Sequence, residues 1–166
     1  MDLSLATSYD ASPEEVFAMI TDITFQEQVF ERLRAESYDI EVGDAGDDLA
    51  VHFHWQTRPA EVPVVARRFV GPTLELAQNK VWHRAEVNGA RQADVDAEVT
   101  GVPVKVTGTT RIVPEGRGTT QEFDLQVTAT SVPVVGRGLE QVVADAVRIR
   151  LENKFEVAWR WLSGSL

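Results

Sequence analysis

The stretch from Gly136 to Leu162 limits most strongly what this chain can fold into. It contains no proline, and no glycine after Gly138, so nothing within it interrupts a helix. At about 100° per residue, most of its apolar side chains fall within one broad arc. These are Leu139, Val142, Val143, Ala146, Val147, Ile149, Leu151, Phe155, Val157, Ala158, Trp161 and Leu162. The pattern predicts an amphipathic helix about 40 Å long, which needs a large apolar surface to cover its buried side.

The composition predicts that this surface belongs to the same domain. With 166 residues, 43% hydrophobic and 25% charged, the chain is predicted to form one globular domain over residues 1–166. A net charge of −10 argues against nucleic acid as a partner and against a broad anionic membrane face. No apolar run is long enough to cross a membrane and no signal-peptide pattern opens the chain, so we expect a cytoplasmic protein without membrane insertion. Without cysteine, disulfides and thiolate metal sites are excluded.

Two helix start signals follow a first predicted strand over residues 3–9. Ser12-Pro-Glu-Glu15 has serine at the N-cap, proline at the first helical position and glutamate at the third, which together form a capping box. Thr24-x-x-Glu27 has the same spacing and predicts a second short helix with Thr24 as its N-cap.

From Ser37 onward the apolar residues repeat with period two, which predicts six further strands. One of these is a long extended segment over residues 73–87, followed at Asn88-Gly89 by a two-residue hairpin turn. Acidic side chains on the predicted outer face of residues 93–99 stand opposite Lys105 and Arg111 of the next strand, which suits an antiparallel register. Clean alternation predicts a sheet that is wet on one side, and the terminal helix is the element long enough to cover the dry side.

This order of elements resembles a known superfamily. The Ala11-Ser-Pro-Glu-Glu-Val-Phe17 opening after the first strand and the long closing helix are similar to START-like, or SRPBCC, helix-grip proteins, which include birch-pollen-allergen proteins, polyketide cyclases and lipid-transfer domains. Within that group the chain is most similar to a small bacterial family of unknown function. The resemblance implies an α+β fold in which a seven-stranded curved antiparallel sheet wraps on the C-terminal helix, with two short helices after the first strand. It also implies a cavity for an apolar small molecule, without a catalytic signature.

The residues themselves are compatible with a cavity that has an apolar wall and few polar groups. Small inner side chains on the strands over residues 93–99 and 104–110 could leave a pocket opposite bulky aromatic ones, or Phe17, Phe30, Phe69 and Phe155 could fill the space. Arg150 and Lys154 fall in the middle of the apolar arc of the helix, where an unpaired cation is costly. Two explanations stay open: they bind the carboxylate or phosphate of a ligand, or their stems reach out to acids at the surface. The predicted ligand-binding residues are Phe53, Trp55, Phe69, Trp82, Phe123, Val147, Arg150 and Lys154.

Other features have two readings each. The segment from Pro63 to Pro72, predicted to form one or two helical turns, could be a lid over the cavity or a cap on a sheet edge. His52 and His54 share a predicted outward strand face, and His83 lies on a different segment with no acid at ligand spacing, so no metal or cofactor is expected. Trp159 on the polar side of the last helix could contact a second copy in a homodimer or pack on the short helices.

Three function classes follow. We favour a binding module for an apolar small molecule of lipid-like or polyketide-like character, which in one version of the hypothesis also carries a negative charge. The second class is a cyclase or dehydratase in which cavity groups such as Thr110, Tyr38 or Arg150 position a reactive intermediate. The third is a protein-interaction domain whose cavity is filled. An acid or histidine with a strongly shifted pKa in the cavity would favour the enzyme, and a completely packed core would favour the third class.

Overall fold

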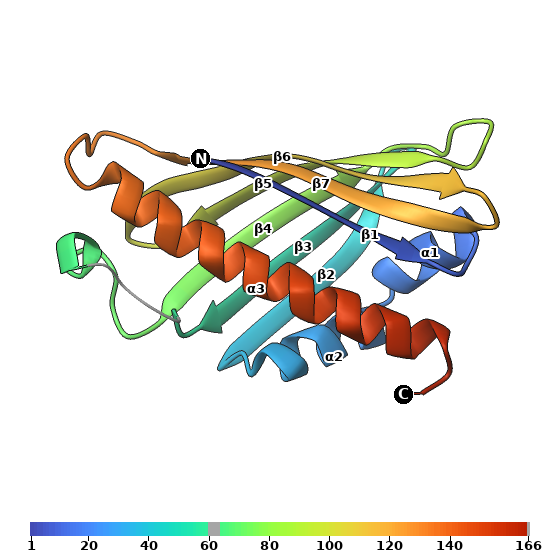
Figure 1. The fold of residues 1–166 in the computed structure, drawn as a ribbon, viewed down its shortest axis with the longest axis horizontal. Coiled ribbons are helices and arrows are strands. Elements are labelled where there is room, and N and C mark those ends of the chain that lie inside the picture. The colour runs from blue at the N-terminus through green and yellow to red at the C-terminus, as the bar shows by residue number, and fades with distance from the viewer. Residues whose placement is uncertain (60–63, 166) are drawn as a thin grey trace.

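The computed structural model describes residues 1–59 and 64–165, which form a curved antiparallel sheet and three α-helices (Figure 1). Over these residues the sheet has seven strands in the order β1-β7-β6-β5-β4-β3-β2, and each strand is antiparallel to its neighbours. The strands are β1 (Asp2–Tyr9), β2 (Ser37–Ala45), β3 (Asp48–Thr57), β4 (Leu74–Trp82), β5 (Arg91–Val99), β6 (Val102–Glu115) and β7 (Gly118–Ala129). This is the α+β helix-grip architecture that the sequence predicts.

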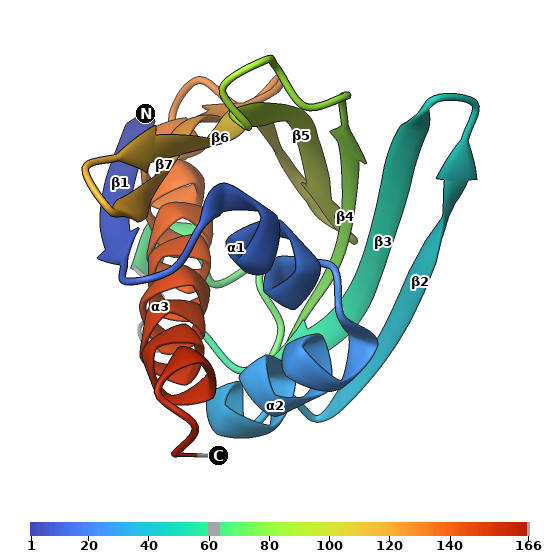
Figure 2. The same cartoon turned by 90° about the vertical axis from the view of Figure 1, so that its right-hand side faces the viewer.

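The long helix α3 (Gly136–Leu162) crosses the concave face of the sheet, which curves around it (Figure 2). Its bounds coincide with the predicted stretch, and its apolar arc faces the sheet: Leu139, Val143 and Ala158 are fully buried. Inner and outer residues alternate along the strands, most regularly in β5, where every second side chain is buried. Each large apolar side chain buried between the two layers contributes about 1.5–3 kcal/mol, so this contact is the main stabilising surface of the fold.

The two short helices, α1 (Pro13–Ile20) and α2 (Ile23–Leu33), lie on the concave side of the sheet (Figure 2), and α2 packs against α3. The predicted capping box of α1 is confirmed: Ser12 Oγ accepts from the Glu15 amide at 3.2 Å, and the Glu15 carboxylate accepts from the Ser12 amide at 2.8 Å. The predicted N-cap of α2 is wrong. Asp22 is the N-cap, since its Oδ1 accepts from the Phe25 amide at 3.0 Å, and Thr24 lies inside the first turn.

The connection between β4 and β5 also differs from its prediction. β4 ends at Trp82 and does not continue to residue 87, and Asn88-Gly89 is not a two-residue hairpin turn. The Asn88 side-chain oxygen accepts from the Ala90 amide at 3.0 Å, while the Gly89 amide donates to the Glu86 carbonyl at 2.9 Å. Asparagine therefore closes a turn with its own side chain within a longer loop.

The predicted charge pairing across β5 and β6 is confirmed in part. Glu98 stands opposite Lys105, but Arg111 stands opposite Gln92 and donates to Glu86 at 3.1 Å. One glycine in β6 allows the neighbouring strand to approach closely. Gly108 has φ +152°, and a Cβ there would lie 2.1 Å from the carbonyl oxygen of Asp124 on β7.

The segment predicted as helical turns contains the short 3₁₀ helix η1 (Val64–Ala66), which packs against α3. Pro63 lies outside the described residues, and whether this segment acts as a lid is untested. Trp159 is half exposed, with its indole N–H donating to the Ser8 carbonyl at 3.3 Å. Within the described part of the chain, no helix is long and apolar enough to cross a membrane.

Candidate functional site

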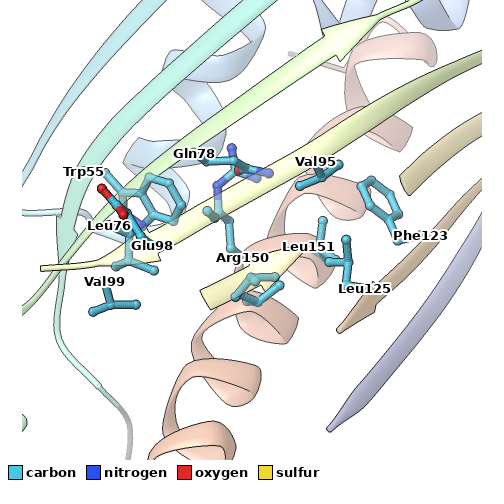
Figure 3. Close-up of a pocket in the computed structure, with 13 residues that line it drawn as sticks. Trp55, Leu76, Gln78, Val95, Glu98, Val99, Phe123, Leu125, Arg150 and Leu151 are labelled. Carbon is cyan, nitrogen blue, oxygen red and sulfur yellow. The ribbon is translucent and has the colours of Figure 1, made fainter. Parts of the chain in front are cut away.

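A small cavity lies between the sheet and α3, at the place that the resemblance implies. Its volume is about 20 Å³, roughly that of one water molecule. Small and medium apolar side chains form most of its wall, and Figure 3 shows Arg150 extending into it from α3. The lining residues are Trp55, Leu76, Gln78, Val95, Ala97, Glu98, Val99, Val106, Phe123, Leu125, Val147, Arg150 and Leu151. As it stands, the cavity is therefore nearly filled by side chains, and it admits a larger molecule only if some of them move.

Arg150 is the most unusual group in this wall. Its side chain is 3% exposed, and its Nε and Nη2 atoms are buried without a hydrogen-bond partner in the described chain. The guanidinium carbon lies 5.0 Å, 4.9 Å and 5.1 Å from the ring centroids of Phe30, Phe53 and Trp55. Cation–π contacts of this kind return about 0.5–2 kcal/mol each. Burying an unpaired charge costs several kcal/mol. The unpaired N–H groups of Nε and Nη2 could offset part of this cost by donating to an anion.

Two lysines complete a buried cation cluster, by which we mean Lys80, Arg150 and Lys154. Lys80 on β4 is 4% exposed and Lys154 on α3 is 1% exposed. Both ammonium nitrogens face the ring of Phe123, at 5.6 Å and 5.0 Å from its centroid. Among residues 1–59 and 64–165, no acidic side chain forms a salt bridge with any member of the cluster. The alternative in which Arg150 and Lys154 reach surface acids is therefore wrong for the described chain.

The electrostatic state of the cluster follows from its burial. Burial, and secondly the charge of Arg150, lowers the pKa of Lys80 to about 7. The pKa of Lys154 is held well below its ordinary value by burial, and further by the charges of Lys80 and Arg150. Burial lowers the pKa of Arg150 to about 10. The guanidinium therefore stays charged at neutral pH, while burial shifts both lysines toward the neutral amine.

A short chain of hydrogen bonds holds Lys154. Gln121 on β7 accepts with its side-chain oxygen from the Tyr9 hydroxyl at 3.1 Å and from the Lys154 ammonium or amine nitrogen at 3.4 Å. The Gln121 amide nitrogen donates to Thr110 Oγ at 3.4 Å, and the Thr110 hydroxyl donates to the Glu122 carbonyl at 2.9 Å. Burial raises the pKa of Tyr9, so its hydroxyl stays protonated and donating. These hydrogen bonds fix the position of the Lys154 nitrogen but provide no negative charge to neutralise it.

The structure brings together most of the predicted ligand-binding residues. Trp55, Phe123, Val147 and Arg150 line the cavity. Two others lie behind the cavity wall. Phe53 contacts the guanidinium of Arg150 and the ammonium of Lys80, while Lys154 contacts the ring of Phe123.

Phe69 and Trp82 are not part of the cavity wall. Phe69 is half-buried under the guanidinium of Arg68, and Trp82 packs edge-on against Phe17 with ring centroids 5.6 Å apart. Of the groups considered for catalysis, Tyr38 stacks on Phe30 with centroids 5.3 Å apart, and Thr110 is committed to the Glu122 carbonyl.

Sequence reasoning missed Lys80 and Gln121, although a signal for each was available. Leu74, Leu76 and Trp82 share one parity along β4, and Lys80 has that same parity. Along β7, Gln121 has the parity of Phe123. A strict period of two places both polar side chains on the inner face.

The histidines lie elsewhere, on the outer face. His54 contacts Glu75 at 2.8 Å, and His83 contacts Asp94 at 2.8 Å and Asp48 at 3.3 Å. In the part of the chain that the structure describes, no group of three or more histidine and acidic side chains is arranged to hold a metal ion.

Solved structures with this fold include proteins of several functions. A protein from Thermus thermophilus is 18% identical, with a TM-score of 0.58 over 95% of this chain and 96% of its own. The Zhui aromatase/cyclase from Streptomyces sp. R1128 is 10% identical, with a TM-score of 0.60 over 98% and 93%. A STAR-related lipid transfer protein from Xanthomonas axonopodis is 12% identical, with a TM-score of 0.53 over 92% and 85%. At these identities the likeness concerns the fold alone.

No curated protein matches the sequence. A family profile does match it, over residues 4–162, and therefore over nearly the whole of the sheet and α3. The chain, with its helix-grip fold and buried cation cluster, therefore belongs to the DUF2505 family, described as "Protein of unknown function".

Proposed function

We propose that this chain binds a small amphipathic anion, an apolar molecule carrying a carboxylate or a similar group, between the sheet and α3. The observation that carries the proposal is the buried guanidinium of Arg150, which lines the cavity with two unpaired nitrogen atoms. A carboxylate accepts two parallel hydrogen bonds from such a group, and charge-assisted hydrogen bonds contribute about 1.5–3 kcal/mol each. Ligand binding would thus offset a cost that the unliganded protein carries.

The apolar part of the ligand would lie along the small side chains of β5 and β6. Val95, Ala97, Val99 and Val106 line that side of the cavity. Because the cavity volume is about 20 Å³, binding requires that neighbouring side chains move apart. A fold that shares its architecture with a lipid transfer protein and an aromatase/cyclase is compatible with such a ligand.

A protein-interaction domain with a filled core is the alternative that the small cavity favours. The buried cation cluster argues against it. A core that serves only to pack would be more stable with three hydrophobic side chains in place of Lys80, Arg150 and Lys154, because none of them has an acidic partner among the described residues.

The test compares octanoate with 1-octanol by isothermal titration calorimetry at pH 7. We expect the wild-type protein to bind octanoate at least tenfold more tightly than the alcohol, and Arg150→Met to abolish this preference. Arg148→Met is the matched control, because Arg148 lies on the exposed face of the same helix. Undetectable octanoate binding by the wild-type protein, or an unchanged preference in Arg150→Met, would contradict the proposal.

A further inference from the structure

The use of lysine in this chain is selective. Of its 16 basic residues only Lys80, Lys105 and Lys154 are lysines, and two of these three lie in the core. Lys105 is exposed and stands opposite Glu98 on the outer face of the sheet. Arginine stays charged at every physiological pH, whereas a buried lysine readily loses its proton. Both core positions are thus occupied by lysine, the basic residue whose side chain can become a nucleophilic amine.

The surroundings of Lys154 favour that amine. Its nitrogen has one hydrogen bond, to the side-chain oxygen of Gln121 at 3.4 Å, and that acceptor requires only one of the N–H groups. The ring of Phe123 lies on another side, and the positive charges of Lys80 and Arg150 disfavour a further charge nearby. Desolvation next to another cation is a known means of making lysine react with carbonyl compounds.

We propose that Lys154, with Lys80 beside it, captures a ligand that carries an aldehyde or ketone group by forming an imine in this cavity. The inference rests on the proposed binding of a small molecule between the sheet and α3, although it does not depend on the charge of that molecule. Lys154 does not line the cavity as it stands, but it is one helical turn from Arg150, and its nitrogen lies 5.0 Å from the ring centroid of Phe123, which does line it. A ligand carbonyl group would come within reach of this nitrogen once side chains of the wall move apart.

The chemistry balances without a co-reactant. The Lys154 nitrogen attacks the carbonyl carbon, the C=O π pair moves to oxygen, and a proton passes from the attacking nitrogen to that oxygen to give a carbinolamine. Lys80, whose ammonium also faces Phe123, donates a proton to the departing hydroxyl, which leaves as water while the C=N bond forms. The nitrogen then returns a proton to Lys80. The net change is one carbonyl compound and one amine converted to one imine and one water, without oxidation or reduction.

The test traps this imine with octanal and sodium cyanoborohydride at pH 6.5 on the full chain. Reduction fixes the adduct, and the protein gains the mass of the aldehyde less one oxygen atom. Lys105 is exposed and stands opposite Glu98 on the outer face of the sheet, so it is the internal reference. We expect peptide mapping to find the adduct at Lys154 in at least tenfold excess over Lys105.

Two outcomes would overturn the inference. An adduct confined to Lys105 and the amino terminus would exclude a reactive core amine, and an adduct at Lys80 in place of Lys154 would overturn the assignment of the nucleophile. Lys154→Arg keeps a cation but has no reactive amine, so it should lose the adduct, while Lys105→Met should keep it. The wild-type map decides the question even if a variant does not fold.

Octanoate titration separates this inference from the proposed function. Octanoate binding without trapped octanal would leave the anion site standing and exclude the imine. Trapped octanal at Lys154 without octanoate binding would support the imine and overturn the proposal of an anionic ligand. Failure of both experiments would overturn both proposals.

Discussion

The ammonium of Lys80 and the guanidinium of Arg150 face the same aromatic ring, that of Phe53, at 5.7 Å and 4.9 Å from its centroid. The first belongs to β4 and the second to α3, so the two layers of the fold meet here through two like charges. The ring offers its negative face to both cations, but it does not neutralise them. The apolar contacts around Phe53 therefore stabilise the packing of α3 on the sheet, whereas the two buried cations lower the free energy of unfolding.

Replacing Arg150 by methionine is expected to stabilise the unliganded protein. The substitution keeps an apolar stem of similar length and removes a buried cation that has no acidic partner in the described chain. We expect the free energy of unfolding to rise by about 1–4 kcal/mol, measured by urea denaturation at pH 7. Arg148→Met should change it by less than about 0.5 kcal/mol, because the side chain is exposed. A less stable Arg150→Met protein would mean that the guanidinium has a partner in the folded state.

The stability of the protein is expected to rise with pH above neutrality. The pKa of Lys80 is lowered from 10.5 to about 7 in the folded state. Between these values the unfolded chain keeps a proton that the folded chain has released, so the cost of burying Lys80 is fully present below pH 7 and disappears toward pH 10.5. Lys80 alone adds a slope of about 1.4 kcal/mol per pH unit to the free energy of unfolding.

Urea denaturation at several pH values from 7.5 to 9.5 measures this slope. Lys80→Met should lower it by the contribution of one proton, whereas Lys105→Met should leave it as in the wild-type protein. Equal slopes in all three proteins would show that Lys80 keeps its proton in the folded state, contrary to the prediction.

A carboxylate next to Lys154 is expected to suppress its reactivity. In Gln121→Glu the Tyr9 hydroxyl keeps an acceptor, but Lys154 gains an anionic partner in place of an amide oxygen 3.4 Å away. The opposite charge raises the pKa of Lys154, and the protein retains an ammonium group. We expect trapping of octanal at pH 6.5 to fall at least fivefold. Gln126→Glu, on the exposed side of the same strand, is the control and should react as the wild-type protein does.

Alanine at position 108 is expected to destabilise the sheet where β6 approaches β7. The new Cβ would lie 2.1 Å from the Asp124 carbonyl oxygen, and the backbone has φ +152°. We expect a loss of at least about 2 kcal/mol in the free energy of unfolding. Gly43→Ala is the matched control, because nothing lies within 4 Å of a Cβ there and φ is not positive. Similar thermal midpoints for the two variants would exclude this close approach.

Features set by local chemistry could be predicted from the sequence. The bounds of α3 follow from an uninterrupted apolar arc, and the start of α1 follows from a capping box whose partners are three residues apart. The start of α2 was predicted wrongly because Asp22 and Thr24 are both good N-cap residues, and the structure uses the aspartate. Local spacing alone does not decide between two such candidates.

Features set by neighbouring strands were harder to predict. Val81 is apolar and Lys80 is charged, so a residue-by-residue reading turns Val81 inward. Pairing decides the opposite: Lys80 stands between Val51 of β3 and Val95 of β5, both buried, and must share their face. The helical wheel did place Arg150 and Lys154 inside. Their lack of acidic partners among the described residues depends on which side chains surround them, which one helix cannot reveal.

The indole of Trp55 gives the molecule an internal optical reporter. It forms part of the cavity wall, and the guanidinium carbon of Arg150 lies 5.1 Å from its ring centroid. Trp82 and Trp161 are packed edge-on against phenylalanine rings away from the cavity, and Trp159 is at the surface. With those three changed to phenylalanine, the emission of a single fluorophore would follow the charge beside it, so that an anion arriving at Arg150 would be visible without a dye.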